Sequence, residues 1–245
     1  MNPDHARLLE EIRAAGRPTA ADRHQTDSYS GSGRPFYVVS APAQRAIARR
    51  WLAERGALGS DAFLAVVESL FDGVSHEEKT LAALLLRENR KARRAVRPAD
   101  VDRWLGKLNG WAEIDGLCQN HFAAEEMIAD WPGWKALIEG LSRDADINKR
   151  RAAMVLLNAP VRYSDDARFV GLALAVIDRL KAERDILITK AVSWLLRSMI
   201  TRHRAAVEAC LAAHGSSLPA VAVRETRIKL ATGTKSGRRK AGGET

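Results

Sequence analysis

The sequence is poor in cysteine and in aromatic residues, and it lacks a long apolar run. Its 245 residues include two cysteines, and aromatic residues make up 6% of the chain. No apolar stretch approaches the roughly 20 residues needed to span a bilayer, and the N-terminus lacks the apolar segment of a signal peptide. Cys118 and Cys210 lie in helical patterns without CxxC spacing, so we expect buried thiols in a reducing compartment. We therefore expect a cytoplasmic protein without membrane association.

The motifs of common metal, nucleotide and hydrolase sites are also missing. Residues 76–80, His-Glu-Glu-Lys-Thr, lack the second histidine of an HExxH zinc motif. The six histidines are scattered without ligand spacing, and no GxGxxG, Walker or GxSxG sequence occurs. The sequence thus predicts neither a metal ion nor another cofactor.

Positive charge is in excess, because 39 lysines and arginines face 30 acidic residues and give a formal net charge of +9. Such an excess favours a polyanionic partner such as nucleic acid. Many arginine-rich proteins are nevertheless basic and bind no anion. The placement of the charges therefore decides more than their total.

Helical periodicity dominates the chain from Ala41 onward. Pro42 suits the first turn of a helix, Pro98 opens another, and Ser75 with Glu78 resembles a capping box. The expected helices cover residues 3–15, 43–55, 61–72, 76–95, 99–108, 111–124, 125–140, 145–158, 165–181, 184–201, 203–213 and 219–231. The polar, Gly- and Ser-rich residues 16–34 predict a linker. We expect an all-α protein with an N-terminal helix and linker (1–34), a repeat domain (35–232) and a basic disordered tail (233–245).

One short pattern recurs before an apolar run: Leu-Ala-Ala from residue 81, Arg-Ala-Ala from residue 151 and Lys-Ala-Val from residue 190. The first two copies are 70 residues apart and the last two 39, and Asp-Gly-Leu, from residue 115, lies almost midway between the first two. The unit of about 35–40 residues is typical of stacked helix pairs of the HEAT or armadillo type. Equivalent positions in such a solenoid line up along one surface. The repeat therefore predicts a superhelical solenoid with a concave, polar and largely basic groove, which is lined by the equivalent positions Leu81, Asp115, Arg151 and Lys190.

Tryptophans accompany these positions at helical spacing. Trp111 lies four residues before Asp115, and Trp194 lies four residues after Lys190, so each pair shares a helix face. Arg197 extends the second face. Tryptophan at such spacing is more often part of a core, and we expect that role for Trp104, Trp131 and Trp134.

Basic residues adjoin Arg151 at the expected start of a helix. Lys149 and Arg150 precede it, and positive charge there opposes the helix dipole, which is a weak indication of function. A solvated helix start is the simpler interpretation of these three residues. Asp115, in turn, could serve only to favour a helix N-terminus.

Four segments carry a resemblance to a known family. They are Phe36–Arg49, with Pro42 and Arg45 after an aromatic start; Trp111–Asp115, a Trp-x-x-x-Asp element; Arg150–Ala153; and Lys190–Arg197, a Lys-Ala-x-x-Trp-x-Leu-Arg element. In this order and spacing, from about Phe36 to Leu230, the chain resembles the AlkD-like DNA alkylation repair family, alkylpurine DNA glycosylases built from HEAT-like repeats. Val38 stands where that family usually has glycine, and Ala112 stands where some members carry a second aromatic residue.

The resemblance implies hydrolysis of the N-glycosidic bond of cationic bases, such as 7-methylguanine and 3-methyladenine, in duplex DNA. It places the family's functional residues on Trp111, Asp115, Arg151 and Trp194. Asp115 would stabilise the positive charge that develops on the deoxyribose, and the two tryptophans would contact the sugar and the base. Alkylated double-stranded DNA is the implied partner. We expect a monofunctional glycosylase without a cofactor, because Lys190 beside arginines would stay protonated and gives no basis for a lyase step. A monomer is the default expectation. Phosphate contacts would come from Arg151 together with Lys149, Arg150, Lys190 and Arg197.

Two alternatives remain open. The first is a non-catalytic HEAT-repeat protein that binds damaged or branched DNA. The second is a HEAT-type scaffold for protein partners, which would bind DNA weakly and with little salt dependence.

Overall fold

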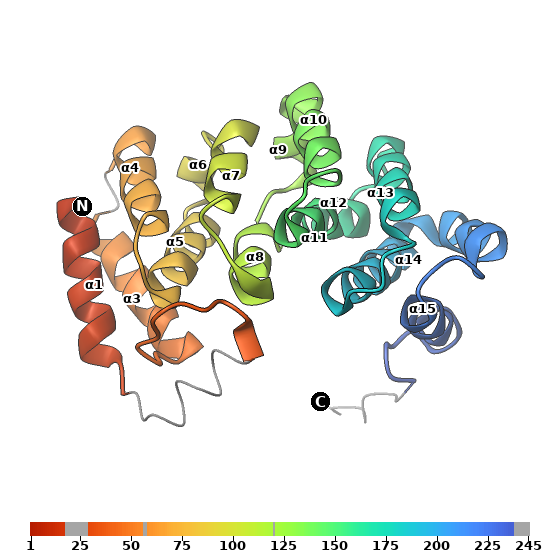
Figure 1. Cartoon of the computed structure of the whole chain (residues 1–245). Coiled ribbons are helices and arrows are strands. Elements are labelled where there is room, and N and C mark those ends of the chain that lie inside the picture. The colour runs from red at the N-terminus through yellow and green to blue at the C-terminus, as the bar shows by residue number, and fades with distance from the viewer. Residues whose placement is uncertain (18–28, 56–57, 120, 238–245) are drawn as a thin grey trace, which may run out of the picture. The chain divides into compact units, whose positions relative to one another are not determined.

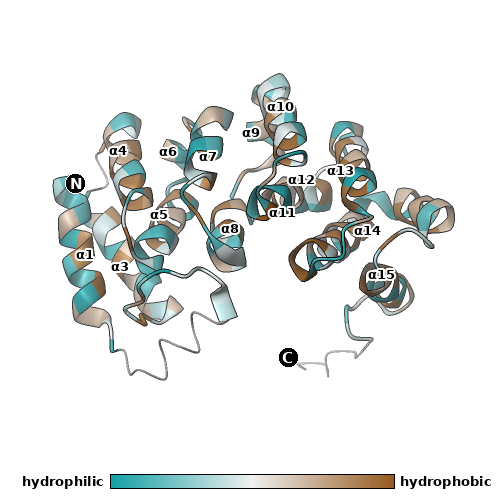
Figure 2. Cartoon of the chain, in the orientation of Figure 1, coloured by the Kyte–Doolittle hydropathy of each residue, from teal (hydrophilic) through white to brown (hydrophobic). Residues whose placement is uncertain are grey.

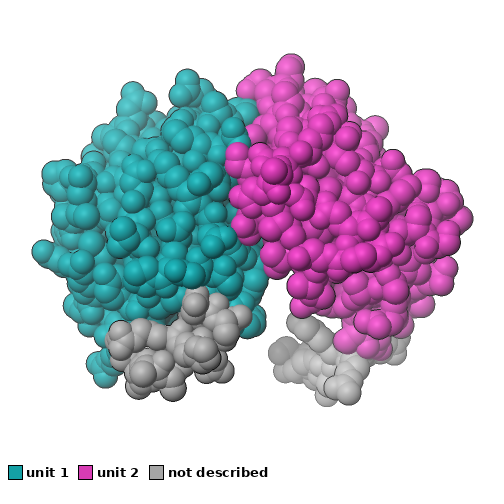
Figure 3. Space-filling model, viewed as in Figure 1, with its two compact units in different colours: residues 1–121 teal, residues 122–245 magenta. Residues whose placement is uncertain are grey.

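The computed structural model describes residues 1–17, 29–55, 58–119 and 121–237. The regular elements in these ranges are helices, without a strand among them, so the predicted all-α fold class is confirmed (Figure 1). Contacts divide the chain into two compact units, Met1–His121 and Phe122–Thr245 (Figure 3). Among the described helices, none has the length and apolar character that crossing a membrane requires.

The first unit is organised around one central helix, α5. Its helices are α1 (Pro3–Ala15), α3 (Ala41–Glu54), α4 (Ser60–Phe71), α5 (His76–Glu88), α6 (Arg90–Arg93), α7 (Pro98–Leu105) and α8 (Gly110–Cys118). Helix α5 packs against α3, α4 and α8, and α1 packs against α3 and α4. Trp51, Phe63, Phe71 and Trp104 are fully buried between these helices. The contacts thus join helices that are near one another in sequence but often not consecutive, such as α3 with α5 and α5 with α8, as in helix-pair solenoids.

The second unit is organised around α14. Its helices are α9 (Ala124–Ala129), α10 (Trp131–Leu141), α11 (Ile147–Val155), α12 (Asn158–Tyr163), α13 (Ala167–Leu180), α14 (Ile186–His214) and α15 (Ala220–Thr232). Helix α14 packs against α11, α12, α13 and α15. Helix α13 is strongly amphipathic, with Phe169, Leu172, Val176 and Leu180 buried on one side. Figure 2 shows hydrophobic and hydrophilic residues side by side on the same helices.

Local sequence signals placed several helix starts correctly. Ser75 caps α5, and both halves of its capping box with Glu78 are present. Pro42 lies in the first turn of α3, and Pro98 begins α7. These residues satisfy or remove backbone N–H groups that a helix start leaves without partners.

Several predicted helix boundaries were wrong. The expected helix 76–95 ends at Glu88, because Asn89 leaves the helical conformation (φ −103°, ψ 78°) and caps the short α6. Asp130 (φ −132°, ψ 56°) separates α9 from α10 in the same way. The expected helix 145–158 is divided between α11 and α12. The helices expected at 184–201 and 203–213 are continuous as α14, with a kink at His203 (φ −126°, ψ 40°).

The predicted linker 16–34 is in part a packed segment. Residues 18–28 lie outside the described ranges, but Ser30 and Ser32 are buried, and the Asn109 side chain donates to the carbonyl of Ser32. Gly110 makes the close approach possible, since it has φ +73° and a Cβ there would lie 2.3 Å from the carbonyl oxygen of Ser30. We call residues 29–40 the N-terminal strap.

Two core assignments differ from expectation. Trp104 and Trp134 are buried as predicted, but Trp131 is half-buried at the start of α10, edge-on to Phe169 and beside the guanidinium of Arg168. Leu81, one of the four repeat positions, is fully buried in the core and cannot belong to a polar surface.

Candidate functional site

Helix α8 places Trp111 and Asp115 one turn apart, and both side chains are half-buried. The indole N–H of Trp111 donates to the carbonyl of Tyr29 at 2.6 Å, and the Tyr29 ring meets the indole edge to face at 5.0 Å. Tyr29 itself is 71% exposed. The strap therefore adds a second, largely exposed aromatic ring beside Trp111.

Asp115 lines a cavity of about 360 Å³ within the first unit. Helix α5 contributes one row of its side chains, from His76 and Thr80 to Arg87, while α3 contributes Gln44 and Arg45. The cavity thus holds the predicted carboxylate together with cationic and hydrogen-bonding groups. An arrangement of this kind suits a substrate that combines phosphates with a developing positive charge.

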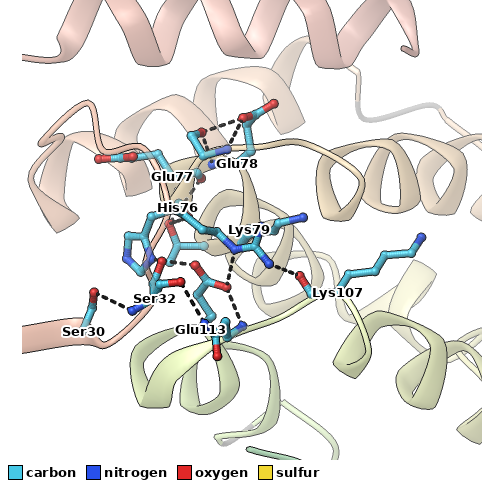
Figure 4. A network of polar contacts seen from close by, with 12 residues as sticks. Ser30, Ser32, His76, Glu77, Glu78, Lys79, Lys107 and Glu113 are labelled. Atoms are coloured by element: carbon cyan, nitrogen blue, oxygen red, sulfur yellow. Dashed lines mark hydrogen bonds and ion pairs between the residues drawn. The ribbon is translucent and has the colours of Figure 1, made fainter. Parts of the chain in front are cut away.

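A polar network surrounds His76, one of the residues that line this cavity (Figure 4). Glu113 is fully buried, and its carboxylate accepts from Arg34 Nε at 3.2 Å and from the backbone N–H of Asn109 at 3.0 Å. The other oxygen of Glu113 lies 3.1 Å from Nδ1 of His76. Arg34 also donates to the carbonyl of Lys107 at 2.6 Å. The network joins the strap, the start of α5 and the start of α8.

A second buried carboxylate holds the strap at a strained residue. Glu77 accepts from the backbone N–H groups of Tyr37 (3.1 Å) and Val39 (3.2 Å), on either side of Val38. Val38 has φ +58°, the one positive φ among the described residues other than glycine. That conformation favours glycine and is costly for a β-branched residue. The structure therefore gives a physical reason for the glycine that the resembled family usually has here.

The α1 helix is attached to the same region through Glu78. Its carboxylate lies 2.7 Å from Nε2 of His5 and accepts from the backbone and hydroxyl of Ser75 at 2.8 and 2.6 Å. Burial raises the pKa of the Glu78 carboxyl, but the hydrogen bonds from His5 and Ser75 outweigh it and lower the pKa to about 2. Nearby, burial lowers the pKa of Lys79 to about 8.

In the second unit, the basic residues at the start of α11 have protein partners. Arg150 pairs with both oxygens of Glu183 at 2.8 and 3.1 Å and donates to the carbonyls of Asp144 and Ala145. Lys149 lies 3.4 Å from Asp144. Arg151 is 5% exposed and donates to the carbonyl of Leu187 at 2.7 Å, which ties α11 to the start of α14. Acidic neighbours thus offset the charge that opposes the helix dipole.

The remaining predicted residues lie on α14. Lys190 is exposed, and Trp194 is half-buried one turn further along. Arg197 donates to the hydroxyl of Ser193 at 3.2 Å and lies 3.5 Å from Glu225, and burial lowers its pKa. Since α11 packs against α14, these residues and Arg151 belong to adjacent helices.

Sequence reasoning missed three contributors to the surroundings of Asp115 and Trp111. His76 was considered only as part of an incomplete zinc motif, and Arg87 was not singled out. Both lie on α5 and line the same cavity. Tyr29 lies in a segment whose polar composition indicated a linker, so the sequence carried no signal for it.

Two further features of the structure bear on the site. Within the described residues, the histidine, cysteine and carboxylate side chains form no cluster suited to a metal ion. An apolar cavity of about 430 Å³ lies between α13 and the end of α14 and contacts Cys210 and Lys181. Burial raises the pKa of the Cys210 thiol, so it is a poor nucleophile.

Comparison with known protein families identifies the class of this all-α protein. Residues 8–230 match the family model described as DNA alkylation repair enzyme. The chain belongs to this DNA alkylation repair enzyme family. The family indicates an enzyme of DNA alkylation repair, with DNA as its partner.

The fold is similar to that of a solved structure described as a predicted DNA alkylation repair enzyme from Enterococcus faecalis. The two chains superpose with a TM-score of 0.68 at 17% sequence identity, over 88% of this chain and 98% of the other. At that identity the similarity concerns the fold. No curated protein matches the sequence significantly.

Proposed function

We propose that this protein is a monofunctional DNA glycosylase that hydrolyses the N-glycosidic bond of cationic alkylated purines, such as 7-methylguanine and 3-methyladenine, in duplex DNA. The observation that carries the proposal is the position of Asp115, which lines a cavity together with Arg45 and Arg87 in a chain of the DNA alkylation repair family. The excess of basic residues agrees with a polyanionic substrate.

The chemistry requires little acid catalysis, because a base that already carries positive charge is a good leaving group. As the glycosidic bond lengthens, positive charge develops on the deoxyribose. The Asp115 carboxylate stabilises that charge electrostatically, in the way that carboxylates act in glycoside hydrolysis generally. Trp111 contributes an aromatic face beside it on α8.

The second unit has predicted roles that belong to the same proposal. Trp194 contacts the substrate, and Lys190 provides an exposed charge for a phosphate. Arg150, Arg151 and Lys149 act mainly by fixing α11, since each has a protein contact, and Arg197 is held by Ser193 and Glu225. A monomeric, cytoplasmic enzyme without a cofactor completes the proposal.

The test is release of 7-methylguanine from a methylated duplex. Wild type and Asp61→Asn, an exposed aspartate at the start of α4, are expected to release the base. Asp115→Asn is expected to lose release at least a hundredfold and to bind the duplex as wild type does. Duplex binding without release by wild type would favour the non-catalytic binder, and absence of both would favour a protein scaffold.

A further inference from the structure

One titratable group in the Asp115 cavity is oriented by contacts that the proposed function does not use. His76 is the first residue of α5, and its side chain is 12% exposed. Its backbone N–H donates to the carbonyl of Pro35 at 3.1 Å, and its ring packs on Phe36 with centroids 4.6 Å apart. The strap therefore holds both the backbone and one ring face of this histidine.

The hydrogen bond to Glu113 determines which ring nitrogen carries the proton. Nδ1 of His76 lies 3.1 Å from a carboxylate oxygen of Glu113, and the other oxygen accepts from Arg34 and from the backbone of Asn109. An ionised carboxylate can only accept, so Nδ1 carries hydrogen in the neutral imidazole. Nε2 then presents its lone pair, and among the described residues none is hydrogen-bonded to it. A buried carboxylate behind an imidazole orients the ring and fixes its tautomer.

His76 and Asp115 line the same cavity, but their chemistry differs. A carboxylate that stabilises positive charge on the sugar must remain ionised throughout the reaction, while hydrolysis of the sugar cation also releases a proton from water. Glu113 on α8 is hydrogen-bonded to this histidine, and Arg34 on the strap pairs with Glu113. The other charged groups that line the cavity with it are Arg45 on α3, Arg87 on α5 and Asp115 on α8.

We propose that His76 is a further catalytic residue, which binds the attacking water through Nε2 and acts as its general base, with Glu113 as its positioning residue. This inference rests on the proposed glycosylase function. As the glycosidic bond breaks, its electron pair leaves with the base and neutralises it. The water oxygen bonds to C1′, and the water proton passes to Nε2 of His76. The products are the neutral alkylated base, an abasic sugar and an imidazolium paired with Glu113.

The test compares single-turnover release of 7-methylguanine from a methylated duplex by wild type, His76→Ala and Gln119→Ala. Gln119 lines the same cavity and is the control for its surface. We expect His76→Ala to release the base more slowly, by about 100-fold or more, with duplex affinity unchanged from that of wild type. Added imidazole should restore part of the rate in His76→Ala alone, and the rate of wild type, but not of the variant, should fall on acidification. Glu113→Gln should slow release while retaining the fold.

The possible failures are distinguishable. If wild type releases no base, the proposed function fails. If wild type and His76→Ala release base equally, the enzyme stands and the general-base role is overturned. The role is also overturned if His76→Ala binds the duplex more weakly but keeps the maximal rate. It is overturned as well if the rate of His76→Ala is slow and imidazole does not restore it. Circular dichroism and thermal unfolding of each variant identify a rate loss that comes from misfolding.

Discussion

The indole N–H of Trp111 donates to the backbone carbonyl of Tyr29 at 2.6 Å, although 82 residues separate them in sequence. Their rings meet nearly perpendicular, at 88°, with centroids 5.0 Å apart. A tryptophan that the family resemblance assigns to the substrate thus also fixes the N-terminal strap on α8. The strap in turn carries Phe36, whose ring contacts His76 in the Asp115 cavity.

Replacing Trp111 with phenylalanine should therefore loosen the strap. The variant keeps an aromatic ring but removes the donor, so we expect the free energy of unfolding to fall by about 1 kcal/mol. Backbone amides of residues 30–34 should exchange with deuterium faster. Trp194→Phe is the matched control, because the Trp194 indole makes no hydrogen bond to another described residue. Equal exchange in the two variants would show that this hydrogen bond does not hold the strap.

Much of the fold was predictable because its signals are local. Ser75 and Glu78 fixed the start of α5, and prolines fixed the starts of α3 and α7, since helix caps depend on residues within one turn. The breaks at Asn89 and Asp130 were missed because the apolar periodicity continues across them. In each case the side chain of the break residue caps the next helix. Sequence patterns alone do not distinguish such a capping residue from an ordinary polar residue inside a helix.

The site was predictable only in part. Repeat spacing selected Asp115, and its four-residue spacing from Trp111 together with the family resemblance selected Trp111; the structure places both on α8. The partners of Arg150 could not be foreseen, because Glu183 lies 33 residues away and meets it only in the folded chain. The same limitation applies to His76 and Glu113, whose hydrogen bond joins two helices.

Val38→Gly should stabilise the protein. The native φ of +58° is strained for valine, and glycine adopts it readily. Relief of that strain should outweigh the added flexibility of the unfolded chain and raise the free energy of unfolding by about 1 kcal/mol. Thermal and urea unfolding measure the change. Val39→Gly is the control and should destabilise, since Val39 is buried; a lower melting temperature for Val38→Gly would show that the side chain of valine stabilises the strap.

Acid should weaken the attachment of α1 through Glu78. Its folded-state pKa, about 2, lies below the ordinary 4.5, so the folded protein binds this proton less readily than the unfolded chain. The stability that Glu78 contributes is present above pH 4.5 and is lost as the pH falls toward 2. The shift corresponds to about 3 kcal/mol. Urea unfolding between pH 5 and 2.5 should show a shallower decline for Glu78→Gln than for wild type or for the exposed control Glu125→Gln; parallel declines would contradict this origin.

The salt dependence of duplex binding should distinguish the roles of two basic residues, Lys190 and Arg150, for which the sequence predicts the same phosphate contact. Lys190 is exposed on α14, whereas Arg150 is held by Glu183 and two backbone carbonyls. If Lys190 contacts a phosphate, Lys190→Ala should lower the slope of log affinity against log salt by about one and weaken binding several-fold. Arg150→Ala should leave that slope unchanged and lower the melting temperature, because it removes the ion pair that Glu183 makes with Arg150. Affinities measured between about 50 and about 200 mM salt decide the matter. A reduced slope for Arg150→Ala alone would mean that Arg150 leaves Glu183 and contacts the DNA backbone instead.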